Sequence, residues 1–496
     1  MSERSPIELD PGSIDVDLAQ VKQRSVRGLF ALTSRTFLVY LISTITTFFL
    51  TVFLSPQIYG TFFLVSAVIN FLTYFSDIGL AAALIQQREK LIRSDLVTTF
   101  TIQQFLVALL VSLLFFFTPL IRSHYHLSQE AVWLLWALAI SLILSSFKTI
   151  PSALLERELA FDRLIIPQIS ENIAYNLVAV FFAWQGYGIT AFTIAVLVRG
   201  CVGLVMTYLI RPWRPALGIK RASLHRLLHF GLPYQVNTLL AVVKDDGMTL
   251  VLGGLVGQTG LGYLGWANKW VSLPLRFFMD NITKVAFPAY ARVQHNESVL
   301  RSSVEKTLFF MALVCFPIFM GMGIIAQPLV ALIPRYSKWN PALFPFYMYL
   351  VNAAWASIST PLTNTLNAIG QIKTTFKLMI MWTVLTWILM PTLGLIYGYQ
   401  GVSLAAALIS FSSIVVLILV RRVIKLNYRQ VLGTPLFATL GMGLAVGGVI
   451  KFNSGFGGII TAIIVGALVY TGLVLLLARH KLIAEISSIT RHLRAT

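Results

Sequence analysis

Long apolar stretches alternate with short polar ones along almost the whole chain. Apolar stretches of about 20 residues have the length of a helix that crosses a lipid bilayer. The pattern predicts thirteen such helices, at 29–54, 59–84, 96–121, 131–154, 164–184, 188–210, 229–256, 304–333, 343–366, 374–397, 401–420, 434–450 and 456–478. One further stretch, 263–286, is long enough to cross but carries several charges.

The charged side chains of 263–286 are Lys269, Arg276, Asp280 and Lys284. At about 100° per residue they fall within roughly 80° of one helical face, and the opposite face is apolar. A helix of this length spans about 36 Å, against about 30 Å for a bilayer core. A soluble amphipathic helix has the same pattern, so length alone does not decide.

The distribution of Lys and Arg decides the question. With 263–286 as the eighth of fourteen spans, both termini are cytoplasmic, 28 of the 38 Lys and Arg residues lie inside, and only Arg122, Arg335, Lys338 and Lys451 lie outside. Without this span, Lys373, Lys377 and the basic cluster at 421–429 would lie outside, against the positive-inside rule. The sequence therefore predicts an all-α polytopic membrane protein of about fourteen transmembrane helices.

The composition agrees with a membrane class: 57% of residues are hydrophobic, 11% are charged, and the mean hydropathy is +0.79. The net charge of +19 would suggest nucleic acid in a soluble protein. Here cytoplasmic loop charge facing anionic lipid explains it, so we expect membrane lipids as partners and no nucleic acid. No phosphate-loop motif and no loop long enough for a catalytic domain are present, so we expect a transporter and no enzyme.

Some charges remain at membrane depth in this topology. The cations are Lys148, Arg199, Lys244, Lys269, Arg276 and Lys284, and the acids are Asp77, Glu171, Asp245, Asp246 and Asp280. Each costs roughly 2.5–3.5 kcal/mol at mid-bilayer on insertion scales. We therefore expect them to line a polar interior.

The chain also carries a weak internal repeat. Segments 54–90 and 256–294 both begin with a glycine turn, carry an acid near the inner end (Asp77, Asp280) and exit into a basic loop, at an offset of about 202 residues. This predicts two six-helix lobes of the same orientation, with the substrate between them. The predicted parts are a polar cytoplasmic tail 1–27, an N-lobe 28–211, a basic linker 212–226, a C-lobe 227–425, a helical pair 434–478 and a basic cytoplasmic tail 479–496.

Three motifs carry a family resemblance. The S-D-x-G-L element at 76–80, the P-x-x-L-L-E-R-E-L-x-F element at 151–161 and the G-Y-L…K-W-V-S-L-P-L run at 262–275 resemble bacterial polysaccharide transporters. These are the Wzx-type oligosaccharide flippases of the multidrug/oligosaccharidyl-lipid/polysaccharide export (MOP) superfamily, and the likeness covers 28–480. The motifs are most similar to the exopolysaccharide or colanic-acid-like subgroup.

The resemblance implies a V-shaped architecture like that of multidrug (MATE) transporters. It also implies flipping of undecaprenyl-pyrophosphate-linked sugar repeat units across the bacterial inner membrane by alternating access. The partners that it implies are the lipid-linked oligosaccharide and the polymerase and chain-length regulator of the same pathway.

For such a substrate we expect Arg199, Lys244, Lys269 and Arg276 to bind the pyrophosphate, because cations supply charge-assisted hydrogen bonds. Trp266 and Trp270 stack on sugar rings in one interpretation and anchor at the membrane interface in the other. The coupling or gating candidates, for H⁺ or Na⁺, are Asp77, Glu171, Asp245, Asp246 and Asp280. Each of three acids also has a structural alternative. Asp77 could cap a helix end, Asp280 could form a salt bridge with Arg276 or Lys284, and Asp245 could pair with Lys244.

We expect no cofactor and no metal site, since His124 and His126 lack a Cys or carboxylate partner at ligand spacing. A multidrug or peptidoglycan-precursor exporter of the same superfamily is the alternative. A drug exporter should carry a buried acid for an organic cation, a role open to Asp245 and Asp246. A membrane polymerase or ligase would need a large outer loop, which the pattern does not contain.

Overall fold

The computed structural model describes residues 40–87 and 91–495, and all regular elements within them are helices. The polar tail 1–27 and the start of the first predicted span lie outside the described residues. A helix Tyr40–Phe53 is followed by α2 (Pro56–Tyr74), α3 (Leu80–Gln86), α4 (Arg93–Tyr125), α5 (Gln129–Arg157), α6 (Phe161–Trp184), α7 (Thr190–Ile210), α8 (Arg221–Val242), η1 (Val243–Gly247), α9 (Met248–Val293), α10 (Glu297–Leu332), η2 (Ser337–Ala342), α11 (Leu343–Ala368), α12 (Ile372–Phe411), α13 (Ile414–Val423), α14 (Tyr428–Phe452) and α15 (Phe456–Ala495). The predicted all-α fold is confirmed.

Every predicted span contains helix, and two predicted turns coincide with glycines of positive φ. Gly257 (φ 69°) interrupts α9 and Gly398 (φ 60°) interrupts α12, at the predicted boundaries before 263 and 401. Such angles suit glycine because it has no Cβ. Among the described residues, nine helices are long and apolar enough to cross a membrane. The count of fourteen spans stays a prediction.

The second predicted span is broken into α2 and α3. Residues 75–79 between them are not α-helical, and both Ile78 (φ 49°) and Gly79 (φ 72°) have left-handed backbone. The S-D-x-G-L element therefore forms a bend inside a predicted span. The seventh predicted span is also irregular, since it runs through α8, the π-helix η1 and the first part of α9.

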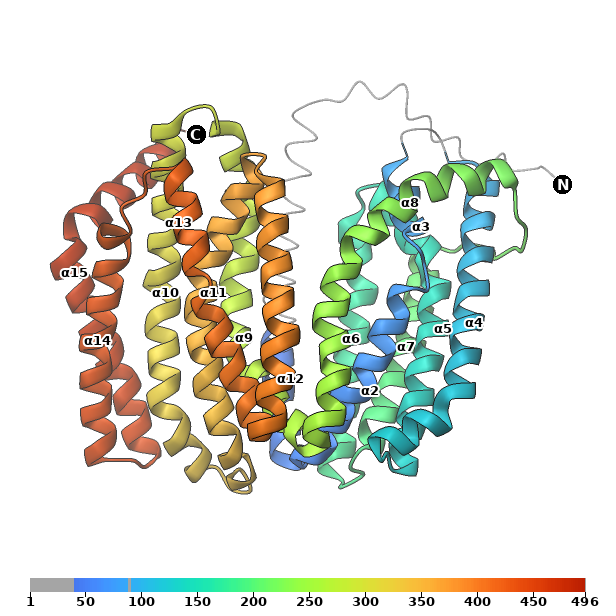
Figure 1. The fold of residues 1–496 in the computed structure, drawn as a ribbon, viewed down its shortest axis with the longest axis horizontal. Helices are drawn as coiled ribbons and strands as arrows, with labels where there is room; N and C mark the ends of the chain where they lie inside the picture. Colours follow the sequence, from blue (N-terminus) through green and yellow to red (C-terminus); the bar gives the residue numbers. More distant parts are fainter. Residues whose placement is uncertain (1–39, 88–90, 496) are drawn as a thin grey trace. The chain divides into compact units, whose positions relative to one another are not determined.

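Contacts divide the chain into two compact units, which we describe separately. Among the described residues, unit 1 contains 40–54 and Thr61–Gly254. In it α7 packs against α5 and α6, α5 against α4, and α8 against α3 and α4 (Figure 1). An apolar cluster at one end joins four of these helices and consists of Leu80, Ala83, Leu84, Phe100, Ile150 and Leu227.

Unit 2 contains Ser55–Gly60 and Leu255–Thr496. Here α10 packs against α11 and α14, α11 against α12, and α14 against α15 (Figure 1). One of its apolar clusters includes Tyr290, Leu300, Val304, Leu308, Leu362, Val416 and Val420. The last boundary between the two units in the sequence follows Gly254, beyond the predicted linker 212–226. The predicted lobes are inferred from the internal repeat and stay a prediction.

Several helix starts follow from local sequence. The side chain of Ser128 accepts a hydrogen bond from the backbone N–H of Ala131, and Asn296 and Asn427 cap α10 and α14 in the same way. Ser and Asn are favoured at this position because their oxygens satisfy a backbone donor that the helix leaves open.

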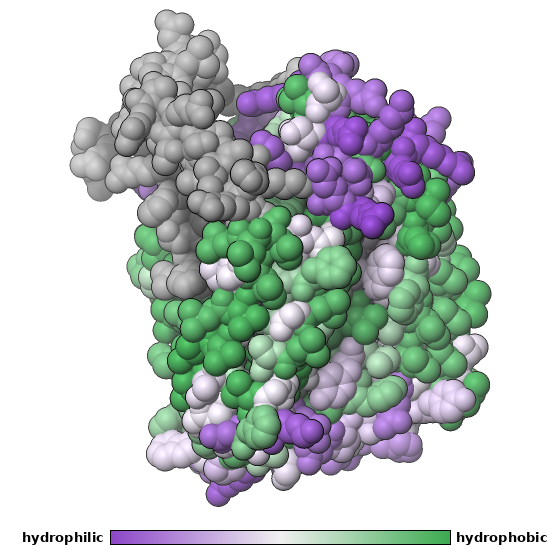
Figure 2. Space-filling model, turned by 90° about the vertical axis from the view of Figure 1, so that its left-hand side faces the viewer, coloured by the Kyte–Doolittle hydropathy of each residue, from purple (hydrophilic) through white to green (hydrophobic). Residues whose placement is uncertain are grey.

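The surface has the banding of a multi-pass membrane protein. On the face seen in Figure 2, an apolar band lies between a hydrophilic upper end and a hydrophilic lower end. Large apolar side chains such as Phe116, Leu444 and Leu476 are exposed on the helices. Exposed apolar area of this extent is suited to lipid and not to water.

Candidate functional site

Arg199 lies near the middle of α7 in unit 1. Its guanidinium carbon is 5.9 Å from the centre of the Tyr175 ring on α6, a distance suited to cation–π attraction. The side chain is exposed in the structure. Arg199 therefore presents a positive charge at membrane depth, supported by an aromatic ring.

Lys148 on α5 and Glu171 on α6 form a largely buried ion pair. Lys148 Nζ is 2.7 Å from Glu171 Oε2, and the two side chains are 16% and 14% exposed. Gly203 of α7 lies directly against the pair, and a Cβ there would overlap the Glu171 carboxylate. The absence of a side chain at Gly203 therefore leaves room for the ion pair. Lys148 neutralises the charge of Glu171, a candidate coupling residue.

Lys244, Asp245 and Asp246 lie in η1, a single π-helical turn between α8 and α9. Lys244 Nζ is 3.0 Å from Asp245 Oδ1, so these neighbours form the predicted pair. The Asp246 carboxylate accepts a hydrogen bond from Asn70 of α2. π-Turns carry an extra residue and recur at functional sites, so η1 is a candidate site in its own right.

Lys269 and Arg276 lie on α9 in unit 2. They are seven residues apart, which places them two turns from each other on the same face. Lys269 is partly buried and Arg276 is exposed. Asp280 and Lys284 are exposed further along the helix, and the predicted salt bridge of Asp280 stays a prediction.

The two tryptophans differ in their surroundings. Trp266 is 4% exposed, stacks on Trp339 with ring centres 5.5 Å apart, and donates its indole N–H to the Tyr336 hydroxyl. These contacts favour a structural role for Trp266 within unit 2. Trp270 is partly buried, and among the described residues its indole nitrogen has no hydrogen-bond partner.

Asp77 has the helix-end position that the sequence allows. Its carboxylate oxygens accept hydrogen bonds from the backbone N–H of Ala81, in the first turn of α3. The adjacent Gly79 touches the backbone of Gly231 on α8, and a side chain at either position would clash. Asp77 and Gly79 thus fix the start of α3 against α8.

The sequence element at 151–161 contacts the C-terminal end of α3. Arg157 donates hydrogen bonds to the carbonyl oxygens of Leu84 (2.9 Å) and Gln87 (2.6 Å). In general, the last carbonyl oxygens of a helix are open to donors from outside it. Glu158 forms an ion pair with Arg211 at 2.6 Å. These contacts at the predicted cytoplasmic end join α5 to α3 and to Arg211 at the end of α7, just before the linker.

The linker 212–226 is attached to α4, which the sequence analysis did not predict. The backbone N–H groups of Gly218 and Lys220 donate to the hydroxyls of Thr101 and Thr98. Arg226 pairs with the buried Asp95 at 2.6 Å. The i, i+3 spacing of the two threonines was the available signal, since it puts both on one helical face.

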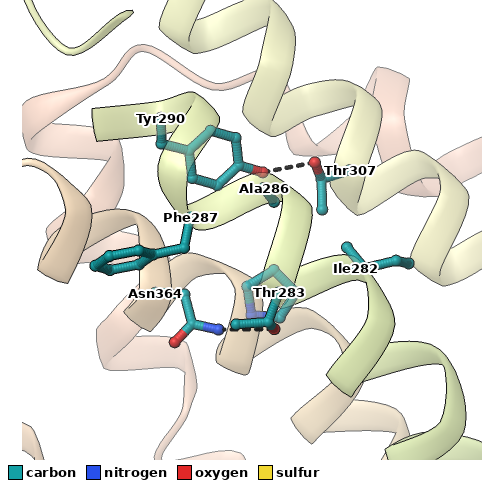
Figure 3. Close-up of a pocket in the computed structure, with 8 residues that line it drawn as sticks. Ile282, Thr283, Ala286, Phe287, Tyr290, Thr307 and Asn364 are labelled. Carbon is teal, nitrogen blue, oxygen red and sulfur yellow. Dashed lines mark hydrogen bonds between the residues drawn. The ribbon is translucent and has the colours of Figure 1, made fainter. Parts of the chain in front are cut away.

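A small cavity lies in unit 2 beside Tyr290 and Thr283 (Figure 3). Tyr290 and Thr307 hydroxyls are 2.5 Å apart, and Asn364 donates to Thr283 at 3.1 Å. The cavity volume is about 10 Å³, room for about one water molecule. It is too small for a sugar.

Within the described ranges, no three His, Cys, Asp or Glu side chains lie together as metal ligands.

A profile of the polysaccharide biosynthesis protein family matches residues 49–343. The chain belongs to this family. It is similar to the lipopolysaccharide biosynthesis protein WzxC of Escherichia coli (24% identity; 72% of each chain) and to the teichuronic acid biosynthesis protein TuaB of Bacillus subtilis (27% identity; 54% of this chain, 55% of TuaB).

Solved structures agree on the fold. The family member matches an inward closed conformation of the lipid II flippase MurJ with a TM-score of 0.74 at 18% identity, over 91% of this chain and all of that one. An inward-facing MATE transporter of the MOP superfamily matches with a TM-score of 0.61 at 15% identity, over 77% of this chain and 93% of that one. The predicted MOP-type membrane fold is confirmed.

Proposed function

We propose that the protein flips undecaprenyl-pyrophosphate-linked oligosaccharide repeat units across the bacterial inner membrane, from the cytoplasmic to the outer leaflet. The product would serve exopolysaccharide, capsule or O-antigen synthesis. The observation that carries this proposal is a set of cations within the predicted membrane spans of a polysaccharide biosynthesis family member, namely Arg199, Lys244, Lys269 and Arg276. Both termini are cytoplasmic, and the protein transports without catalysing a reaction.

The pyrophosphate explains the need for these cations. An unpaired charge is costly to bury, so a diphosphate needs charged hydrogen-bond donors along its route. Arg199 and Arg276 provide planar forks that bind two oxygens at once, whereas Lys244 and Lys269 provide point charges. Trp270, whose indole nitrogen has no hydrogen-bond partner in the described part of the chain, is the remaining aromatic candidate for sugar contact.

The proposed mechanism is alternating access, in which the binding residues face the two sides of the membrane in turn. The membrane potential supplies about 2.3 kcal/mol per charge per 100 mV, and an anionic headgroup moving outward already gains from it. An H⁺ or Na⁺ gradient would instead return the empty, positively charged carrier. Asp245, Asp246 and Glu171 are the available ion sites, with Asp77 and Asp280 as gating candidates.

Depletion of the protein in its native host tests the function. The expected result is accumulation of lipid-linked oligosaccharide in the cytoplasmic leaflet and loss of surface polysaccharide, while peptidoglycan synthesis and drug resistance stay normal. The polymerase and chain-length regulator of the pathway are the expected partners. Unchanged polysaccharide together with increased drug sensitivity would favour a multidrug exporter, and arrested peptidoglycan synthesis would favour a peptidoglycan-precursor exporter.

A further inference from the structure

Helix α6 has two contrasting faces. Five polar side chains, Gln168, Glu171, Asn172, Tyr175 and Asn176, follow the i, i+3, i+4, i+7, i+8 spacing and lie within about 140° of one face. The opposite face carries Ile166, Ile173 and Leu177, which are 47%, 38% and 67% exposed. The exposed apolar face suits lipid, so the polar face is turned toward the protein.

The polar face lies against α5 and α7, which pack on α6 in unit 1 (Figure 1). Lys148 of α5 pairs with Glu171, and Arg199 of α7 lies over the Tyr175 ring. Polar groups at membrane depth are expensive and tend to be functional. The ion pair accounts for Glu171 but not for the amide side chains beside it.

Hydrogen-bonding capacity remains open on this face. The Gln168 Oε1 atom is buried and has no partner among the described residues. Asn172 Oδ1 accepts from Asn176 Nδ2 at 3.2 Å, while the Asn172 Nδ2 donor has no protein partner within the described ranges. Amide side chains both donate and accept hydrogen bonds. Here they lie beside an aromatic ring at predicted membrane depth, so they could bind a ligand of matching chemistry.

The kinds of group present select the ligand class. A sugar ring offers hydroxyls that donate and accept and an apolar C–H face that packs on an aromatic ring, which matches Asn172, Gln168 and Tyr175. A pyrophosphate prefers cations, and an organic cation prefers a free carboxylate, whereas Glu171 is already paired. A lipid tail would avoid all of these groups.

We propose that Gln168, Asn172 and Tyr175 form a subsite for a sugar ring of the lipid-linked substrate, with Arg199 beside it toward the pyrophosphate. This proposal rests on the proposed function and adds the place where the saccharide is bound. The subsite contacts the sugar and leaves the lipid anchor to other parts of the protein.

Binding of two lipids to the purified full-length protein tests the subsite. The first probe is the lipid-linked oligosaccharide extracted from host cells depleted of the protein, and the second is undecaprenyl pyrophosphate without sugar. We expect Asn172→Ala to weaken binding of the first probe roughly tenfold, as for a lost hydrogen bond in a water-poor site, and to leave the second unchanged. Ile173→Ala, the neighbouring residue on the lipid face, should change neither.

A labelling experiment tests the subsite independently and applies even if Asn172→Ala does not fold. Asn172→Cys, with Cys201→Ser and Cys315→Ser, should be alkylated by a membrane-permeant maleimide. The glycosylated probe should slow this reaction and the sugar-free lipid should not. Equal effects of the two lipids, or none, would overturn the subsite. A wild-type protein that bound neither lipid would contradict the proposed function itself, and the subsite with it.

Discussion

Gly60 and Gly262 are separated by the repeat offset of 202 residues and pack against each other's segments. A Cβ on Gly60 would overlap the carbonyl oxygen of Gln258, and a Cβ on Gly262 would overlap that of Pro56. Pro56 and Gln258 are separated by the same 202 residues. The contact is therefore reciprocal in the sense of a two-fold axis, which supports a repeat that the sequence shows only weakly.

The first prediction concerns this glycine contact. Gly60→Ala and Gly262→Ala should each lower the thermal unfolding midpoint in detergent, because overpacking costs about 1–3 kcal/mol and the clashing atoms belong to backbone. Gly447→Ala is the matched control, since a Cβ there meets nothing within 4 Å and alanine favours a helix. Equal unfolding midpoints for Gly60→Ala and Gly447→Ala would contradict the prediction. They would show that the segments around Gly60 and Gly262 can move apart without loss of stability.

The second prediction concerns the ion pair of Lys148 and Glu171. Lys148→Met should destabilise the protein by about 3–5 kcal/mol, because it leaves a buried carboxylate without its partner. Adding Glu171→Gln should restore most of that loss. The comparison is made by thermal unfolding of the three proteins.

The more exposed pair of Arg301 and Glu305 on α10 provides the control for this comparison. Their separation is 3.0 Å, and they are 42% and 24% exposed. Arg301→Met should therefore cost about 0–1 kcal/mol. If it cost as much as Lys148→Met, burial would not explain the first result.

Hydrophobic patterning predicted the helices well, because each apolar stretch must satisfy its own backbone in lipid and only a helix does so. The breaks were harder to predict. The bend at Ile78 and Gly79 and the π-turn at η1 depend on contacts with α8 and α2, which no local pattern contains. The attachment of the linker to Thr98 and Thr101 is equally a tertiary effect.

The candidate site was predicted only in part. A count of charges along the predicted spans identifies which charges lie at membrane depth, but it does not show how they pair. The ion pair of Lys148 with Glu171 is an example. Trp266 shows what sequence position leaves open. Its position beside Lys269 allows sugar stacking or anchoring at the membrane interface, and only the structure shows that it is buried and stacks on Trp339. The polar face of α6 has the spacing of one helical side, a signal that a count of charged residues alone does not contain.

The third prediction concerns Lys338 in the loop between α10 and α11. Burial, and then the nearby charge of Arg335, lower the pKa of Lys338 from 10.5 to about 8. Above pH 8 the unfolded chain therefore holds a proton that the folded protein has lost, so this group makes stability rise between pH 8 and about 10.5. Lys338→Met should remove the rise. Identical unfolding midpoints against pH for both proteins would contradict the assignment.

The fourth prediction concerns the coupling ion. Transport in proteoliposomes is measured with a proton or Na⁺ gradient imposed or set to zero. If Asp245 takes the ion, Asp245→Asn should transport without responding to the gradient, while the wild-type protein responds. Identical responses would leave Asp245 only its pairing with Lys244, and Asp246 or Glu171 would then be tested in the same way.

Flipping of the lipid-linked oligosaccharide by the purified protein tests the central claim most directly. Proteoliposomes are loaded with host-derived substrate, and the fraction that reaches the opposite leaflet is read by a membrane-impermeant glycosidase. We expect rapid flipping by wild type, none above protein-free vesicles for Arg276→Ala, partial flipping for Arg276→Lys because a point charge replaces a fork, and wild-type rates for Arg122→Ala in a predicted outer loop. Equal flipping by wild type and Arg276→Ala would remove Arg276 from the site. No flipping by wild type would contradict the proposed function.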